Sequence, residues 1–216
     1  MTIKAVSEGR FRWLKPSSGH VWGVSNARLK PASRATTDVS EILAVTPGLF
    51  REFARLNTAG DEIQRDEIRN FADGFGDILA LPHEEHASLE TWTHAIQRMH
   101  RAVELWDRSN DPDRGEPSKQ RASRELRLEI NHALRDTKTP SHTTSGLTLG
   151  LRLEIFPVNL LAYMWLTLAR IASREIEERR CIMCPERFYV GSGFGLQRAD
   201  TLTCSVACRK RKQRAV

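Results

Sequence analysis

The chain has 216 residues, of which 40% are hydrophobic and 28% are charged. This globular balance excludes wholesale disorder and collagen-like repeats, and the length suits one medium domain with a small additional module. The most apolar segment, residues 158–169, is 12 residues long, whereas a membrane span needs roughly 20. We therefore expect no membrane partner. Because no apolar stretch of signal-peptide length opens the chain, we expect a cytoplasmic protein.

The formal charge of +6 is unevenly distributed along the chain. Residues 179–216 hold nine basic and two acidic side chains, whereas residues 1–178 hold 24 basic and 25 acidic side chains and carry a net charge of −1. All four cysteines also lie in the C-terminal segment. We therefore predict a mainly helical body, residues 1–178, and a small module, residues 179–216, and we assign the basicity to the module alone.

Residues 1–45 show no sustained helical period, and we predict irregular segments and short strands there. Three aromatic residues of this segment, Phe11, Trp13 and Trp22, lie near several basic side chains. Such a group can stack on bases or on a ligand, but packing in the core of a small sheet is the favoured interpretation.

The rest of the body has helical periodicity. In its clearest helix, the apolar residues from Leu89 to Trp106 recur at alternating spacings of three and four, which places them in one buried stripe. The last helix is apolar over most of its circumference, so we expect it at the centre of the core. The helices predicted in the body cover residues 49–56, 63–78, 82–107, 117–135 and 160–176.

A minor β element is predicted between Gly146 and Phe156. Apolar residues occupy every second position there, which is the spacing of a strand or a hairpin with one buried face. The body is therefore predicted to be mainly helical with a small β component.

The strongest chemical motif is a close pair of cysteines, Cys181 and Cys184, followed by a second pair, Cys204 and Cys208. Each pair supplies two thiolates from one tight turn, and the intervening 19 residues allow the chain to fold back and join them. One structural Zn²⁺ is the favoured interpretation, and four ligands leave no position for a catalytic water. A disulfide pair or free buried thiols are the alternatives.

The sequence around the cysteines predicts a small fold built on the metal. Residues 188–190 read as a strand, residues 191–195 as a turn, residues 202–203 as a return strand and residues 205–214 as a helix. This knuckle, hairpin and helix have a treble-clef-like order, and a unit of fewer than about 40 residues needs the metal to fold. The predicted fold class is therefore mainly α (α+β), with a helical body, a minor β element and a C-terminal treble-clef-like zinc finger.

The C-terminal module resembles the zinc fingers of a broad set of bacterial proteins, including the CGNR-type fingers of stress-responsive transcription regulators, in the segments RRCIMCPERFYV and TLTCSVACRKRKQR. The four cysteines match in role, as do Phe188 and Ser205, whereas Cys208-Arg-Lys-Arg211 replaces the family's Cys-Gly-Asn-Arg. The body is similar to the helical domains that precede such fingers in the segments TPGLFREFARLNTAGDEIQRDEIRNFADGFGDIL and LLAYMWLTLARIA. The resemblance implies a DNA-binding regulator.

The residues that follow Cys208 are strongly basic, with five cations in six positions that encircle the predicted helix. Attraction to phosphates is one interpretation, and a solvated chain end or a tail for another acidic partner is the alternative. Phosphate contacts carry no base information, and arginine and lysine can contact either phosphates or bases, so the sequence decides neither the target sequence nor the choice between DNA and RNA. The candidate nucleic-acid-binding residues are Arg209, Lys210, Arg211, Lys212 and Arg214.

A weaker candidate metal site lies at the predicted start of the long helix, where His83 and His86 precede Glu90 and His94. The two histidines lack the spacing that places them one turn apart around a catalytic glutamate. A solvated helix face is therefore the favoured interpretation.

These observations predict a zinc-dependent nucleic-acid-binding regulator, in particular a DNA-binding transcription regulator whose body senses a ligand or forms homo-oligomers. The alternative is a protein-interaction module with a purely structural zinc finger. An enzymatic function is disfavoured because the sequence contains no visible catalytic constellation.

Overall fold

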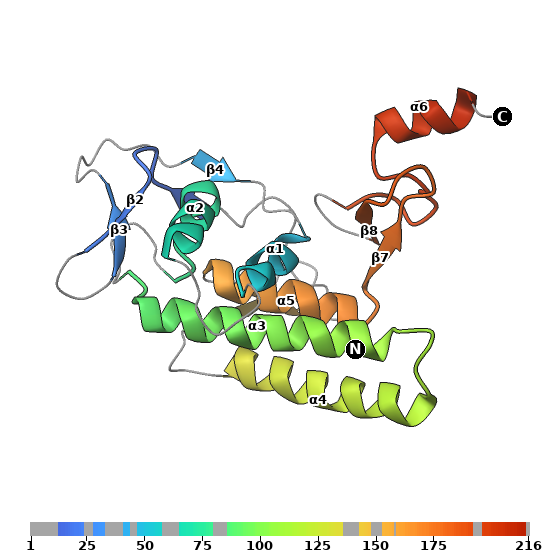
Figure 1. The fold of residues 1–216 in the computed structure, drawn as a ribbon, viewed down its shortest axis with the longest axis horizontal. Helices are drawn as coiled ribbons and strands as arrows, with labels where there is room; N and C mark the ends of the chain where they lie inside the picture. Colours follow the sequence, from blue (N-terminus) through green and yellow to red (C-terminus); the bar gives the residue numbers. More distant parts are fainter. Residues whose placement is uncertain are drawn as a thin grey trace.

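The computed structural model describes residues 13–23, 28–32, 41–43, 47–57, 65–79, 86–135, 143–147, 153–157, 159–191 and 196–214. Within these residues the chain forms six α-helices and four two-stranded antiparallel pairs, so the mainly helical class is confirmed (Figure 1). No described helix combines the length and apolar character that crossing a bilayer requires. The helices are α1 (Leu49–Arg55), α2 (Arg65–Phe75), α3 (Leu89–Ser109), α4 (Glu116–Arg135), α5 (Leu160–Ala172) and α6 (Val206–Arg214).

The core of the body lies between α1, α3, α4 and α5. The long helices α3 and α4 run antiparallel, and α1 and α5 pack against this pair (Figure 1). The stripe predicted in α3 is confirmed, since Trp92, Ile96 and Met99 are fully buried. Nine of the 13 residues of α5 are buried, which confirms its central position.

Three aromatic rings join α1, α2 and α3. Phe53, Phe71 and Trp92 contact one another in tilted and edge-on arrangements, with ring centroids 5.3 to 6.1 Å apart. Such pairs contribute about 1 kcal/mol each beyond the burial of their area. This cluster holds the two short helices against the long one.

The start of α3 differs from the prediction. Ser88 is the N-cap of this helix and accepts a hydrogen bond from the Thr91 N–H at 3.1 Å. The N–H of Ala87 instead donates to the buried carboxylate of Asp77 at 3.1 Å. Because these bonds hold the preceding backbone outside the helix, the predicted start at residue 82 was wrong.

The end of α5 also differs from the prediction, which extended this helix to residue 176. Arg174 has a left-handed backbone conformation with φ +63°, and the N–H of Glu175 donates back to the Arg170 carbonyl at 2.9 Å. The N–H of Arg174 donates to the Ile171 carbonyl at 3.0 Å, which completes a Schellman motif. Glycine usually occupies the left-handed position, so an arginine there concealed the helix end.

The β structure consists of short antiparallel pairs. The hairpin predicted from the alternation around Gly146 is confirmed, and so are short strands in the first 45 residues. The pairs are β1 (Trp13–Lys15) with β4 (Glu41–Leu43), β2 (His20–Trp22) with β3 (Leu29–Pro31), β5 (Thr143–Leu147) with β6 (Leu153–Pro157), and β7 (Ile176–Arg180) with β8 (Arg187–Gly191).

The prediction that the N-terminal aromatic residues pack in a core is tested for one of the three. Trp22 packs against the main core, and its Nε1 donates to the Arg65 carbonyl at 3.1 Å, so the core-packing interpretation is confirmed for this residue. Trp13 lies in β1. Phe11 lies outside the described residues.

The hairpin of β7 and β8 connects the body to the C-terminal module. Ile176 and Tyr189 pack with the main core, whereas Phe188 and Val190 pack with the cysteines in a second, small core. The predicted boundary between residues 178 and 179 falls within β7. Beyond the hairpin, α6 projects away from the helical body (Figure 1).

Candidate metal centre and its basic helix

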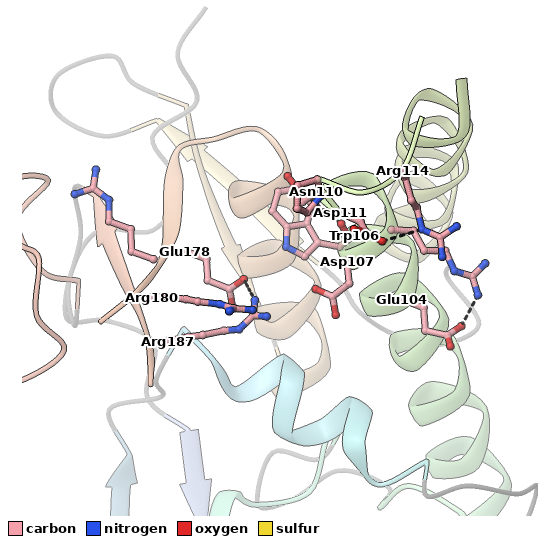
Figure 2. Close-up of a pocket in the computed structure, with 12 residues that line it drawn as sticks. Glu104, Trp106, Asp107, Asn110, Asp111, Arg114, Glu178, Arg180 and Arg187 are labelled. Atoms are coloured by element: carbon pink, nitrogen blue, oxygen red, sulfur yellow. Dashed lines mark hydrogen bonds and ion pairs between the residues drawn. The ribbon is translucent and has the colours of Figure 1, made fainter. Parts of the chain in front are cut away.

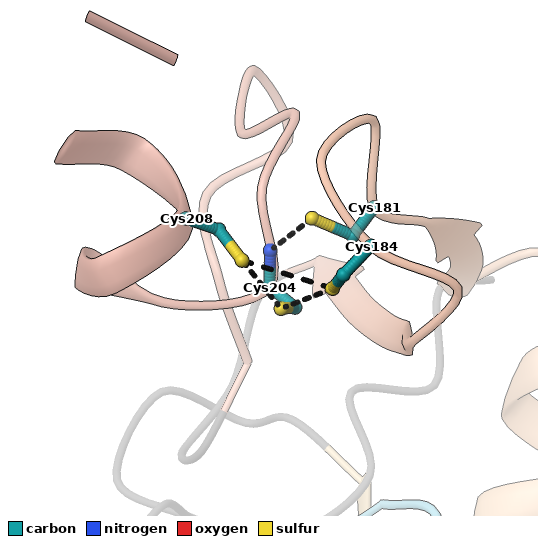
Figure 3. Close-up of side chains that lie close together, drawn as sticks. All are labelled: Cys181, Cys184, Cys204 and Cys208. Carbon is teal, nitrogen blue, oxygen red and sulfur yellow. Dashed lines mark hydrogen bonds between the residues drawn. The ribbon is translucent and has the colours of Figure 1, made fainter. Parts of the chain in front are cut away.

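The four cysteines come from two segments that the fold brings together (Figure 3). Cys181 and Cys184 lie in the turn between β7 and β8, and the Cys181 N–H closes this turn on the Glu186 carbonyl at 2.8 Å. Cys204 precedes α6 and Cys208 lies in its first turn. The paired spacing therefore places two sulfurs on a hairpin turn and two at the start of a helix.

The four sulfurs converge on one point. Their Sγ atoms all lie within 4.8 Å of one another. The Sγ atom of Cys204 lies 3.5 Å from that of Cys184 and 3.7 Å from that of Cys208, and Cys184 and Cys208 are also 3.7 Å apart. A tetrahedral ion with metal–sulfur bonds of about 2.3 Å requires sulfurs about 3.8 Å apart. The donor set and its spacing thus fit one metal ion.

The cysteines are free thiols and form no disulfide with one another. A disulfide needs sulfurs about 2 Å apart, well below the separations found here. Two of the four, Cys181 and Cys208, are buried, and the other two are half-buried. A closed four-sulfur site of this kind is typical of structural metal ions, and it would leave no position for a reacting water.

Backbone donors favour the charged form of one sulfur. The Sγ of Cys181 accepts hydrogen bonds from the N–H of Cys204 at 3.3 Å and of Met183 at 3.4 Å. Burial opposes ionisation of Cys181, but these donors outweigh it and lower its pKa to about 6. Burial and the neighbouring thiols raise the pKa of Cys204 to about 12. A divalent cation offsets the mutual repulsion that thiolates at such short distances create.

The chain between the two cysteine pairs differs in part from the prediction. Residues 202–203 form no strand, so the predicted return strand was wrong. The Leu202 carbonyl accepts a hydrogen bond from the Ile182 N–H at 3.3 Å, and the Cys204 N–H donates to the Cys181 sulfur. These backbone groups therefore bind the cysteine turn and do not pair with a neighbouring strand. Gln197 makes an isolated bridge with Val190 instead. The predicted turn at residues 191–195 lies mostly outside the described residues.

The second candidate metal face does not assemble. Glu90 and His94 are exposed on α3, and His86 faces Asp77, with its Nδ1 3.3 Å from the carboxylate oxygen. His83 lies outside the described residues. In the described part of the chain, the four cysteines are the only group of three or more potential ligands that converges on a point.

The helix α6 presents its cations to solvent. Cys208 is the only buried residue of this helix, Lys212 is half-buried, and the other basic residues are exposed. Among the described residues, no carboxylate forms an ion pair with any of them. The predicted helix at residues 205–214 is confirmed, since α6 spans Val206–Arg214, and its cations are Arg209, Lys210, Arg211, Lys212 and Arg214.

A partly buried ion-pair network that the sequence did not reveal holds the module against the body. Arg51 of α1 donates to both carboxylate oxygens of Glu178 in β7, at 2.8 and 2.9 Å, and also binds Asp107 of α3 at 2.9 Å. Arg187 and Tyr189 of β8 donate to the same Glu178 carboxylate at 2.8 and 3.0 Å. The glutamate side chain is only 9% exposed.

This network, which we call the joint, also sets the ionisation of Glu178. Burial raises the pKa of this carboxyl group, but the donors from Arg51, Arg187 and Tyr189 outweigh burial and lower the pKa overall. Beside the joint is a pocket of about 800 Å³ between Trp106 on α3 and Arg180 on β7 (Figure 2). Residues of the joint lie far apart in the sequence, and no local pattern marks them.

Comparison with known proteins identifies no relative. No protein-family model, no curated protein and no solved structure matches the chain.

Proposed function

We propose that the protein is a zinc-dependent nucleic-acid-binding regulator, and specifically a DNA-binding regulator of transcription. In this proposal Cys181, Cys184, Cys204 and Cys208 hold one structural Zn²⁺ in a treble-clef-like finger. The helix α6 contacts phosphates, and the helical body senses a ligand or forms homo-oligomers. The observation that carries the proposal is the set of cations on α6, all but the half-buried Lys212 exposed, without carboxylate partners in the described residues.

The metal has a mechanical role in this proposal. Two of its four ligands, Cys204 and Cys208, flank the start of α6, while the other two belong to the hairpin that the joint holds on the body. The metal would therefore fix the direction of the basic helix, whose own side chains make few contacts. Among the described residues of the module, the small second core contains only four buried ones, so there is little apolar burial to replace the metal.

Unpaired cations on an exposed helix favour a polyanionic partner. Each phosphate that a lysine or arginine neutralises on duplex DNA releases counterions and contributes roughly 0.9 to the slope of log affinity against log salt concentration. Such cations also repel one another, which costs free energy until an anion binds. Ion-paired arginines, by contrast, must break an existing interaction before they contact a phosphate.

The proposal is tested with a variant in which Arg209, Lys210, Arg211 and Lys212 are replaced by Ala. We expect weaker binding to duplex DNA of every sequence and a flatter salt dependence, by roughly 0.9 per lost contact. Zinc content should not change, because none of these side chains is a ligand. Duplex DNA, single-stranded DNA and RNA should be compared at two salt concentrations, which also shows the preferred nucleic acid.

A matched control removes four arginines that are ion-paired on the surface of the body. The control variant replaces Arg69, Arg108, Arg114 and Arg121 with Ala, which changes the net charge equally. If both variants lose affinity to the same extent, the effect is general charge and not the surface of α6. If wild type binds no nucleic acid at about 50 mM salt, the nucleic-acid proposal is rejected.

A second candidate function, docking of a protein partner, is favoured by apolar side chains around the metal site. Ile182, Leu202 and Val206 are 55%, 47% and 62% exposed, and they account for three of the five large hydrophobic residues that are exposed in the described chain. Leu202 and Val206 line one hollow with Arg209 and Lys212. An acidic segment with apolar residues would match this surface. Replacing Leu202 and Val206 with Ser should impair such docking and leave phosphate contacts intact.

A further inference from the structure

A groove on the helical body gathers basic side chains although the body as a whole carries a net charge of −1. The groove has a volume of about 670 Å³ and lies along α4 and the end of α5. Its single carboxylate, Glu116, accepts a hydrogen bond from Gln120 at 3.2 Å. The hydroxyl groups of Ser109 and Ser123 also line it. Its four cations are Lys119, Arg124, Arg127 and Arg174.

Helical geometry places three of these cations together. Lys119, Ser123 and Arg127 follow one another at intervals of four residues, and Arg124 lies beside them, so they share one face of α4. The buried face of α4 is a different one, formed by residues such as Leu126 and Ile130. Packing of the core therefore does not require the basic face.

Apart from Glu116, the acidic residues of α4 are engaged outside the groove. Glu125 accepts from Arg121 at 3.0 Å, and Glu129 accepts from Arg98 of α3 at 2.7 Å. Within the described residues, no carboxylate forms an ion pair with Arg124 or Arg127. Like charges crowded into one groove destabilise the helix unless an anion binds there.

The fourth cation links the groove to the C-terminal module. Arg174 is the left-handed residue that ends α5, and β7 begins two residues later at Ile176. A non-glycine residue in this conformation costs about 1 kcal/mol, and such strain is concentrated at functional positions. A ligand bound to Arg174 would contact the connection between body and module directly.

We infer that this groove is a binding site for a phosphate-bearing anion, held by Lys119, Arg124, Arg127 and Arg174. Guanidinium groups match phosphate oxygens in a two-pronged geometry, and serine hydroxyls add donors. The volume lies within the range of small-ligand sites. The phosphate belongs either to the backbone of a nucleic acid or to a free phosphorylated small molecule. The site does not depend on the proposed role of α6 and stands if that helix binds no nucleic acid.

The test uses inorganic tripolyphosphate as the probe and isothermal titration calorimetry of the full chain at about 50 mM salt. The groove variant replaces Arg124 and Arg127 with Gln, and the control variant replaces Arg121 and Arg135 on the same helix with Gln. All four side chains are exposed, so both variants should fold. We expect the groove variant to bind at least about tenfold more weakly than wild type and the control variant to bind normally, because only the former loses charge-assisted hydrogen bonds.

Three results would overturn the inference. The first is that wild type does not bind tripolyphosphate at about 1 mM, and the second is that the groove variant and its control lose affinity for tripolyphosphate equally. The third is that the α6 quadruple variant loses this affinity while the groove variant keeps it. Duplex DNA then identifies the source of the phosphate. If the groove variant loses binding of both tripolyphosphate and duplex DNA, the ligand of the groove is a nucleic-acid backbone. Loss of tripolyphosphate alone assigns a free phosphorylated molecule.

Discussion

The arginines of the joint and the cations of α6 both adjoin the C-terminal module but have opposite environments. At the joint, Arg51 and Arg187 converge on the buried carboxylate of Glu178. On α6, the basic side chains are solvated and lack carboxylate partners among the described residues. The difference teaches that formal charge does not identify a binding surface, because pairing decides whether a cation holds the protein together or remains available to a partner.

The cysteine cluster lies between these two regions and connects them, and loss of the metal proposed there should have the largest effect. The proposed function has the chain bind about one zinc ion, and replacing Cys184 with Ser should abolish that binding. Metal binding and folding are coupled by a free energy on the order of 10 kcal/mol, so α6 and the cysteine turn should lose their protection from amide hydrogen exchange. The joint and body should stay folded. Metal analysis and hydrogen exchange measure both outcomes.

The control for this variant is Ile182→Ser, which changes an exposed side chain in the same turn. It should retain the metal and the protection of α6. A Cys184→Ser protein whose C-terminal module remains folded without metal would refute the metal site.

An intermediate effect is expected from breaking the joint. The change Glu178→Gln removes the charge that Arg51 and Arg187 share and should lower the free energy of unfolding by about 3 kcal/mol, measured by urea denaturation. The neighbouring Glu177→Gln is the matched control, because Glu177 pairs with Arg179 at the surface, where ion pairs contribute little. Equal effects of the two changes would show that the joint does not hold the module.

Acid provides a second measurement on the joint. Since the folded protein lowers the pKa of Glu178, the unfolded chain binds more protons, and this carboxylate stabilises the fold fully only above its ordinary pKa of 4.5. The contribution disappears as the pH falls below that value towards the pKa of the folded state. The difference in stability between wild type and Glu178→Gln should therefore shrink on acidification. A constant difference would contradict the network as the source of the effect.

The smallest effect is expected at the connection between the two regions. Arg174→Gly should raise the free energy of unfolding by up to about 1 kcal/mol, because glycine adopts the left-handed conformation without strain. Arg174→Ala should bring no such gain, since alanine keeps the strain. The same glycine variant should bind tripolyphosphate more weakly, so stability and ligand binding should change in opposite directions. Thermal denaturation and calorimetry test the two effects separately.

Local patterns predicted much of this protein. The stripe from Leu89 to Trp106, the apolar α5 and the two cysteine pairs each carry their information within a few turns of chain, and all three lie as predicted. The basic helix was also predicted within one residue of its observed start. These features depend on side-chain periodicity and ligand spacing, which sequence shows directly.

The helix boundaries that were predicted wrongly depend on distant hydrogen-bond partners or on an unusual backbone conformation. The start of α3 is decided by Asp77, which captures the Ala87 N–H, and the end of α5 by an arginine in a conformation that favours glycine. The prediction of a return strand at residues 202–203 was wrong because the backbone groups of this segment bind the cysteine turn. Each backbone group needs a partner, and which partner is in reach depends on the folded chain.

The sequence by itself determined the helical class, the four candidate metal ligands and the excess charge of the C-terminal module. Only the tertiary structure decided how cations are used: it pairs Arg51 with Glu178 across 127 positions of sequence and gathers Arg127 with Arg174 in one groove. The prediction that basicity belongs to the module alone was therefore incomplete, since a groove of the body is basic as well. Electrostatic interactions act over a few ångströms in space, and net charge summed along a sequence does not contain those distances.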